Sequence, residues 1–321
     1  MRKKDILSNL QAIPSEKGII FLKKEENFLY VRRTKNIRKS INNFFTSRNQ
    51  DDVLFQLISQ TTDFDWKTET NQLQILATEK KMLKKIEPQF NDKLNFWRNY
   101  FYLAIDFYNV PYFSTAEDTQ KKKFYVGPFH SNFFIIDVIG CFAELLKAPA
   151  CEGEDFPCER LKKQQCLGYC LEETKKIQNL ISKYYLHPNW EFLKRKRQDQ
   201  GNLLRDLQFT QAELLKKEIN LIDSYYKHLQ FLLSIKHIKW EDNIAGVHYR
   251  IEDGILAKAG DFEFPVIIPE YRENEILAVN KEHLDEMLWC YEFLCQHATE
   301  KLDKQKQKSI EELIKLGYLE S

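Results

Sequence analysis

The sequence predicts a mixed α/β (α+β) protein built from a small sheet with flanking helices, a cysteine-rich metal module, a helical hairpin and a small α+β tail. Three observations predict this class. Residues 17–33 have the pattern of a β-hairpin, and residues 35–86 carry apolar side chains mostly at helical spacing. Residues 171–235 are almost wholly helical in pattern. Near the end, Asp253-Gly254 separates two β-type runs, which is a strong local hairpin signal.

The N-terminal elements follow in order. The hairpin strands are predicted at 17–24 and 27–33, around the polar turn Glu25-Glu26. Helices are predicted at 35–45 and 51–59 because their apolar residues fall on one face.

A short strand near Phe64–Trp66 precedes a helix over residues 71–86. Pro88 ends that helix because the residue before a proline disfavours the α region.

Further along, a buried helix is predicted at 133–146, followed by the cysteine-bearing loop. In the tail we expect strands at 247–251, 255–259 and 264–268, and then a helix over 280–301. The predicted units are therefore 1–95, a sheet-and-helix domain; 96–175, a central region with the cysteine loop; 176–235, a helical hairpin; and 236–321, a small α+β domain.

Composition limits the classes of function. Apolar residues make up 43% of the chain, and Gly and Pro are few, so we expect globular units. The 48 Lys and Arg balance 47 Asp and Glu, which excludes a global polycation and leaves local clusters to attract nucleic acid. No apolar segment follows the basic N-terminus, and no stretch suits a membrane span. We therefore expect a cytoplasmic protein without a membrane partner.

Glu79 is the most informative single residue. It lies within the apolar stripe of the predicted helix 71–86, between Ile75, Leu76 and Leu83. A carboxylate in that position costs free energy unless it is paired or binds a cation. Two interpretations remain open, namely a cation site or a glutamate that reaches solvent or pairs with a nearby arginine.

Tyr30 lies just before a strongly basic run. The strand is expected to place Phe28, Tyr30 and Arg32 on one face. The cluster suits contacts with DNA phosphates, which dominate nucleic-acid affinity, and a solvated face is the alternative. The candidate DNA-binding residues are Arg32, Arg33, Lys35, Arg38 and Lys39.

Four cysteines lie within one loop, spaced C-x6-C-x7-C-x3-C. Four thiolates together suit an iron–sulfur cluster or a tetrahedral zinc ion. The loop lacks the C-x2-C pair that is common in zinc ribbons, which favours iron–sulfur. The candidate ligands are Cys151, Cys158, Cys166 and Cys170.

The N-terminal segment resembles the first domain of the UvrC-like GIY-YIG nucleases. The matching parts are Lys17-Gly18-Ile19-Ile20, the run from Leu29 to Lys39, and Glu79 twelve residues before Asn91. This resemblance implies a GIY-YIG-type sheet and a metal-assisted phosphodiester hydrolysis. By position it assigns the catalytic roles to Tyr30, Glu79 and Asn91, with Glu79 holding Mg²⁺ or Mn²⁺.

The sequence also departs from the family pattern. Ile20 replaces a tyrosine, Arg32 replaces a glycine and Arg33 a lysine. Ser40 replaces the catalytic arginine, and Phe44 replaces a later tyrosine. Loss of a transition-state cation typically costs about a hundredfold or more in rate. We therefore expect an endonuclease fold with weakened or lost activity.

The resemblance continues beyond this domain. Residues 124–129 are similar to a UvrC segment, and the cysteine loop is similar to one that ligates a 4Fe–4S cluster in that family. Residues 207–219 resemble the helical UVR motif, which implies a UvrB-like partner, while any amphipathic hairpin is the alternative. The tail resembles UvrC-like halves fused to exonucleases, which implies an exonuclease partner instead. We expect no C-terminal nuclease half.

Together these features lead us to expect a UvrC-related DNA-repair protein of the nucleotide-excision type. It would bind DNA and nick one strand, or act as an inactive nuclease-fold adaptor that binds DNA or a repair partner. The expected cofactors are a 4Fe–4S cluster, with zinc as the alternative, and Mg²⁺ or Mn²⁺ if the nuclease is active.

Overall fold

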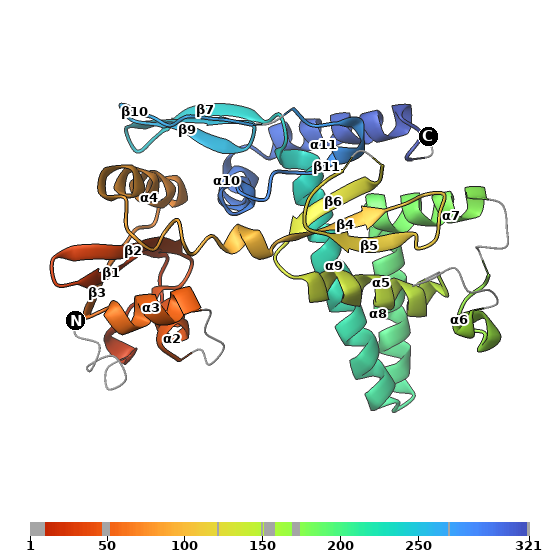
Figure 1. Ribbon diagram of the computed structural model, residues 1–321. Coiled ribbons are helices and arrows are strands. Elements are labelled where there is room, and N and C mark those ends of the chain that lie inside the picture. Colours follow the sequence, from red (N-terminus) through yellow and green to blue (C-terminus); the bar gives the residue numbers. More distant parts are fainter. Residues whose placement is uncertain are drawn as a thin grey trace. The chain divides into compact units, whose positions relative to one another are not determined.

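The structure is a computed structural model that describes residues 10–46, 52–120, 122–148, 150, 158–168, 174–268 and 270–319. It divides into two compact units (Figure 1). Unit 1 comprises residues 1–96, 239–267 and 285–297, and unit 2 comprises 97–238, 268–284 and 298–321. The tail, residues 236–321, is therefore shared between the two units.

Unit 1 begins with an antiparallel sheet in the order β2-β1-β3. Its strands are β1 (Gly18–Lys24), β2 (Asn27–Thr34) and β3 (Asp63–Thr68). Its first helices are η1 (Leu10–Ala12), α2 (Ile37–Thr46), α3 (Asp52–Gln60) and α4 (Gln72–Ile86). The hairpin, the third strand and the three α-helices predicted from the sequence are all confirmed.

The two faces of this sheet carry separate apolar clusters. Ile20 and Leu22 of β1 pack with α2 and α3, whereas Ile19 and Phe21 pack with Ile75 of α4. This follows from the alternation of side chains along a strand. Gly18 permits close approach of β3, because a Cβ there would lie 2.1 Å from the carbonyl oxygen of Lys67.

The second part of unit 1 comes from the tail. An antiparallel sheet in the order β10-β9-β8-β7 is formed by β7 (Lys239–Ile244), β8 (Val247–Glu252), β9 (Ile255–Ala259) and β10 (Phe262–Glu263). Helix α10 (Leu284–His297) belongs to the same unit except at its first residue. Helix α4 lies between the two sheets, in contact with β2 and β9 (Figure 1).

The tail differs from its prediction in three ways. Residues 264–268 form no strand, and β10 is the two-residue pair Phe262–Glu263 instead. The strand β7 was not predicted, since its sequence is mostly polar and its residues alternate little. The helix predicted over 280–301 is two helices, α10 and α11 (Thr299–Lys315), separated at Ala298, which is not helical.

Unit 2 contains a four-stranded sheet in the order β11-β6-β4-β5, in which β11 runs parallel to β6. The strands are β4 (Phe101–Ile105), β5 (Phe113–Ala116), β6 (Phe124–Phe129) and β11 (Leu277–Ala278). The short helical turns are η2 (Phe96–Asn99), whose first residue belongs to unit 1, α6 (Glu159–Lys162), η4 (Ser182–Leu186) and η5 (Glu273–Glu275). The longer helices, with α11, are α5 (Asn132–Leu146), α7 (Thr174–Ile181), α8 (Trp190–Arg205) and α9 (Phe209–Ile235).

The predicted helical hairpin is confirmed. Helices α8 and α9 run side by side and turn at Leu207, whose φ is 58° (Figure 1). Helix α9 buries Ile222, Tyr225 and Leu229 against the rest of unit 2. In the described part of the chain no helix has the length and apolarity that a bilayer span requires.

Candidate functional site

Helix α4 positions Glu79. The helix begins at an N-cap, Asn71, whose side chain accepts hydrogen bonds from the backbone of Leu73 at 2.9 Å and Gln74 at 3.2 Å. It ends at Glu87, which has the left-handed conformation, just before Pro88. The apolar side of α4 faces the sheet, so Glu79 is held there with only 4% of its surface exposed.

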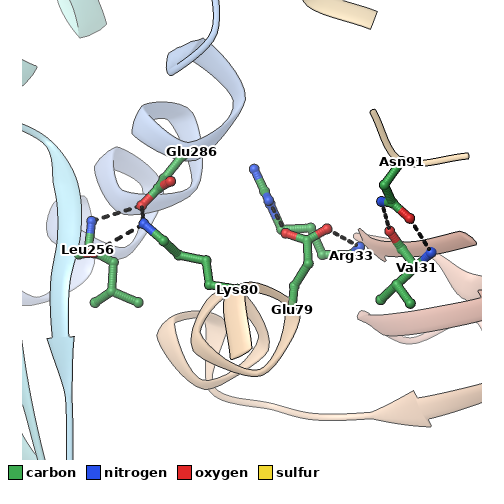
Figure 2. Close-up of polar contacts among 7 residues, drawn as sticks. All are labelled: Val31, Arg33, Glu79, Lys80, Asn91, Leu256 and Glu286. Carbon is green, nitrogen blue, oxygen red and sulfur yellow. Dashed lines mark hydrogen bonds and ion pairs between the residues drawn. The ribbon is translucent and has the colours of Figure 1, made fainter. Parts of the chain in front are cut away.

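Arg33 of β2 meets Glu79 with two donors. The backbone N–H of Arg33 donates to Glu79 Oε1 at 2.8 Å, and its guanidinium Nη1 donates to Oε2 (Figure 2). Burial lowers the pKa of Arg33, but the charges of Glu79 and Glu286 outweigh burial and raise it overall, so the guanidinium stays charged. Of the interpretations left open for this glutamate, the structure shows pairing with an arginine.

Helix α10 covers this pair. Trp289 is 7% exposed and packs in the cluster of Ile75, and the Arg33 guanidinium lies 5.5 Å from its ring centroid. Gln72 of α4 donates to the backbone carbonyl of Trp289 at 3.2 Å and to Glu292 at 3.1 Å. No local sequence pattern indicates this contact, because Gln72 and Trp289 are 217 residues apart.

A second charged contact joins α4 to the tail. Lys80 Nζ donates to Glu286 Oε1 at 2.7 Å and to the backbone carbonyl of Leu256 at 3.2 Å (Figure 2). Glu286 also accepts from the backbone N–H of Leu256 at 3.0 Å. The helix that carries Glu79 is therefore fixed by hydrogen bonds on two sides.

Tyr30 lies in the core, not on an open face. It is 3% exposed, and its ring packs edge-on against Phe44 with centroids 5.7 Å apart. Burial raises the pKa of Tyr30 to about 12, an effect that Arg32 offsets only in part. A phenol of this kind stays protonated at neutral pH, which disfavours it as a proton acceptor.

The predicted common face of Phe28 and Tyr30 is wrong. A β-bulge shifts the register between Leu22, which pairs with Tyr30, and Lys23, which pairs with Phe28. As a result Phe28 packs with the cluster of Phe21 on the α4 side, while Tyr30 packs on the α2 side.

Asn91 makes two hydrogen bonds to one residue of β2. Its Oδ1 accepts from the Val31 N–H at 3.0 Å, and its Nδ2 donates to the Val31 carbonyl at 2.7 Å (Figure 2). Strand β2 is at the edge of its sheet, so these bonds satisfy backbone groups that have no strand partner. In this structure the Asn91 side chain satisfies the backbone groups of Val31, and its catalytic role stays a prediction.

The basic run has several internal partners. Arg33 pairs with Glu79, Lys35 pairs with Glu292, and Arg38 donates to the backbone carbonyl of Ile13 at 2.7 Å. Arg32 lies over the ring of Phe96, 4.3 Å from its centroid. Lys39 is exposed on α2, and it has no ion-pair partner among the described residues.

The residues that depart from the family pattern make contacts within the fold. Ile20 is fully buried and Phe44 is 8% exposed, both in the cluster on the α2 side. The Ser40 hydroxyl lies 2.6 Å from the Thr34 hydroxyl, at a site where the family pattern has an arginine. Neither Arg32 nor Arg38 is directed to Glu79 by any described contact.

These residues do not suit a divalent cation at Glu79. Both carboxylate oxygens already accept hydrogen bonds from Arg33, whose charge neutralises the carboxylate. Within the described ranges there is no cluster of three or more His, Cys, Asp or Glu residues that would hold a metal ion. A hard cation prefers several oxygen ligands with free lone pairs, so the pair with Arg33 competes directly with metal binding.

Two of the four candidate cluster ligands can be described. Cys158 is half-buried and precedes α6, and Cys166 is 7% exposed. The backbone N–H of Gly168 donates to the Cys166 sulfur at 3.4 Å, and neither thiol forms a disulfide. Cys151 and Cys170 lie outside the described residues. Such an N–H donor would stabilise a thiolate at Cys166.

Comparisons with known proteins show which family the first domain is similar to. Residues 17–92 match the family described as the UvrC-like GIY-YIG domain. The chain is 27% identical over 225 residues to the UvrABC system protein C of Methanococcus maripaludis, covering 67% of this chain and 42% of that protein. It is 26% identical over 267 residues to the protein of that name from Mesoplasma florum, covering 80% of this chain and 44% of that protein.

The chain thus spans less than half the length of these two relatives. Among solved structures, the GIY-YIG N-terminal endonuclease domain of UvrC from Thermotoga maritima, a point mutant bound to its catalytic divalent cation, matches 28% of this chain and 98% of that chain. The identity is 20% and the TM-score is 0.26. The family match, the relatives and the sheet with its glutamate-bearing helix agree, and we conclude that residues 17–92 of this chain form a UvrC-like GIY-YIG domain.

Proposed function

We propose that this chain is a UvrC-related DNA-repair protein of the nucleotide-excision type whose GIY-YIG domain binds DNA without cutting it. The observation that carries the proposal is the occupation of both Glu79 carboxylate oxygens by Arg33. This is the adaptor alternative of the sequence prediction, and the geometry favours it over the nicking enzyme.

Arg33 is favoured over a divalent cation in the competition for Glu79. To bind a cation, Glu79 would have to release Arg33, whose side chain is only 15% exposed and lies against Trp289. Removing one partner of a buried ion pair leaves an uncompensated charge and costs about 3–5 kcal/mol. The protonated, buried Tyr30 and the uncharged Ser40 then offer neither a base nor a transition-state cation.

The exposed cations of this domain are the proposed contacts with DNA phosphates. Lys35 and Lys39 are exposed, and the pair of Lys35 with Glu292 is itself open to solvent, with side chains 61% and 41% exposed. Exposed pairs of this kind contribute little to stability, so a phosphate can replace the carboxylate. Arg33 and Arg38 serve the fold instead, because their guanidinium groups are engaged within unit 1.

The hairpin of α8 and α9 is the proposed contact for a repair partner. Around its turn, four large apolar side chains are exposed by between 45% and 73% of their surface: Leu204, Leu207, Phe209 and Leu214. Exposed apolar groups gathered at one tip indicate a protein contact. A UvrB-like protein is the proposed partner, with an exonuclease as the alternative.

The cysteine loop is the proposed site of a 4Fe–4S cluster, with zinc as the alternative. Reduced thiols at Cys158 and Cys166, and the N–H donor of Gly168 to the latter, support a metal-thiolate site. Such a cluster would act as a structural staple for the segment between α5 and α7.

A nicking assay combined with a binding assay tests the proposal. The full chain is incubated with supercoiled plasmid and Mg²⁺ or Mn²⁺, and binding of a labelled duplex is measured in parallel. We expect the duplex to be bound and the plasmid to stay supercoiled. Metal-dependent nicking that disappears in both Tyr30→Phe and Glu79→Gln variants would overturn the proposal, as would the absence of any DNA binding.

A further inference from the structure

A cavity of about 400 Å³ opens beside the Arg33–Glu79 pair in unit 1. Residues that line it include Arg32, Lys35, Ser40, Phe44, Phe96 and Trp289, and we call it the Arg32 cavity. Its volume lies in the range of roughly 300–1,000 Å³ that is usual for small-ligand sites.

Among the residues that the structure describes, cations and no acidic residue line the Arg32 cavity. The charge of Arg33 is balanced by Glu79, and that of Lys35 by the exposed Glu292. Arg32 has no carboxylate partner among the described residues, and it is the lining cation that stays uncompensated. The cavity therefore favours an anionic ligand.

The Arg32 guanidinium is the donor group placed to bind such an anion. The Arg32 guanidinium is held against Phe96 at 4.3 Å from the ring centroid, and an arginine fixed in this way presents its planar donors to a phosphate. Arg33 keeps its Nε–H buried and without a hydrogen-bond partner in the described structure.

The rest of the lining is apolar and aromatic. Phe44, Leu54, Phe96 and Trp289 supply carbon surface, and Ser40 adds a hydroxyl. A ligand made only of phosphate would leave this surface without a contact. A planar ring joined to a phosphate would use both parts of the cavity, because aromatic surface and cations together suit a nucleotide.

We propose that the Arg32 cavity binds a nucleoside monophosphate unit, with the phosphate at Arg32 and the base against the apolar wall. The proposal goes beyond DNA binding by the exposed lysines, since it needs neither a duplex nor a metal ion. The unit is either a free mononucleotide or the phosphorylated end of a DNA strand, and both present the same chemistry.

Calorimetric titration of the full chain with dAMP tests the proposal, with inorganic phosphate and deoxyadenosine as separate probes. We expect saturable 1:1 binding of dAMP and weaker binding of either part alone. Arg32→Gln should weaken binding about tenfold or more, since a charge-assisted pair is lost. Arg32→Lys, which keeps the charge but not the planar fork, should have an intermediate effect. Lys24→Gln is the matched control, because Lys24 is an exposed cation of β1 outside the cavity.

A short oligonucleotide with and without a 5′-phosphate identifies the source of the ligand. Stronger binding of the phosphorylated strand than of dAMP supports a DNA end, and the reverse order supports a free nucleotide. The proposal fails if dAMP shows no saturation at millimolar concentration, if inorganic phosphate binds as tightly as dAMP, or if Arg32→Gln, folded by its melting curve, binds dAMP like the wild type. None of these results depends on whether duplex DNA is bound or cut.

Discussion

Arg33 donates to both carboxylate oxygens of Glu79, with its backbone N–H at 2.8 Å from Oε1 and its guanidinium on Oε2. The alternation of β2 turns Arg33 toward α4, opposite Ile19 of β1, and α4 turns Glu79 toward β2. At the carboxylate for which the family resemblance predicts a divalent cation, the structure thus has the guanidinium of Arg33.

The first prediction concerns the stability of this pair. Arg33→Met leaves a buried carboxylate without its partner, and we expect a loss of about 3–5 kcal/mol in the free energy of unfolding by urea. The double variant Arg33→Met/Glu79→Leu should recover most of that loss, because no buried charge remains.

The exposed pair of Lys23 and Asp65, 3.3 Å apart, is the matched control. Lys23→Met should cost about 1 kcal/mol or less. If Arg33→Met were as mild as this control, the pair with Glu79 would not be formed in solution.

The second prediction concerns DNA. The double variant Lys35→Glu/Lys39→Glu should weaken binding of every duplex by a similar factor and make the affinity less dependent on salt, since phosphate contacts carry no sequence information. Fluorescence anisotropy at two salt concentrations measures both effects. Lys24→Glu, a charge reversal of an exposed lysine on β1, should leave the affinity nearly unchanged.

Arg38→Gln separates a structural role from a DNA contact. Its guanidinium holds the backbone of Ile13 and Gln11, so we expect a lower free energy of unfolding with little change in DNA affinity at equal folded fraction. A strong loss of affinity in Arg38→Gln, with none in the lysine pair, would place the DNA surface elsewhere on α2.

The third prediction concerns the cysteine loop. Protein purified without oxygen should contain iron and sulfide, and Cys158→Ala or Cys166→Ala should remove both. Cys295→Ser is the control, because Cys295 is exposed on α10 and lies outside the loop. Cys290 is fully buried, so its replacement would disturb the core and is not a suitable control. Stoichiometric zinc without iron would select the zinc alternative, and protein free of metal would exclude both.

The fourth prediction concerns Lys236, which is 5% exposed. Its ammonium donates to the backbone carbonyls of Glu275 at 2.7 Å and Ile276 at 3.3 Å. Burial lowers the pKa of Lys236 to about 7, whereas the unfolded chain keeps the ordinary value of 10.5. Between these values the unfolded chain binds the proton and the folded chain does not, so the free energy of unfolding rises with pH.

Wild type and Lys236→Met are compared by urea unfolding at pH 7.5 and pH 9. One proton contributes about 1.4 kcal/mol per pH unit, so the wild type should gain about 2 kcal/mol relative to the variant over this interval. An equal change in both proteins would mean that Lys236 keeps its ordinary pKa in the fold.

Local patterns predicted much of unit 1. The alternation of residues 17–33 gave the β1–β2 hairpin, and the apolar stripe with Pro88 gave α4 and placed Glu79 inside. Asp253 and Gly254 have φ angles of 49° and 80°, as a short hairpin turn requires, and they join β8 to β9 as predicted.

What could not be predicted depends on contacts far apart in the sequence. No local pattern predicts that Trp289 packs against Arg33. The same is true of the ion pair between Lys80 and Glu286, which are 206 residues apart in the sequence. The bulge that turns Tyr30 away from Phe28 adds one residue to a strand, and strict alternation misses it. The pairing of Glu79 with Arg33 could have been predicted, because Arg33 lies two residues after Val31 and therefore on the same side of the strand, which faces α4.

Manganese binding tests the central claim most directly. The full chain and its Glu79→Gln variant are titrated with Mn²⁺, and free Mn²⁺ is measured by electron paramagnetic resonance. Because Arg33 occupies both oxygens of Glu79, we predict that the two proteins bind Mn²⁺ alike, with no stoichiometric site below millimolar concentration that depends on Glu79. A 1:1 site in the wild type that disappears in Glu79→Gln would contradict the account.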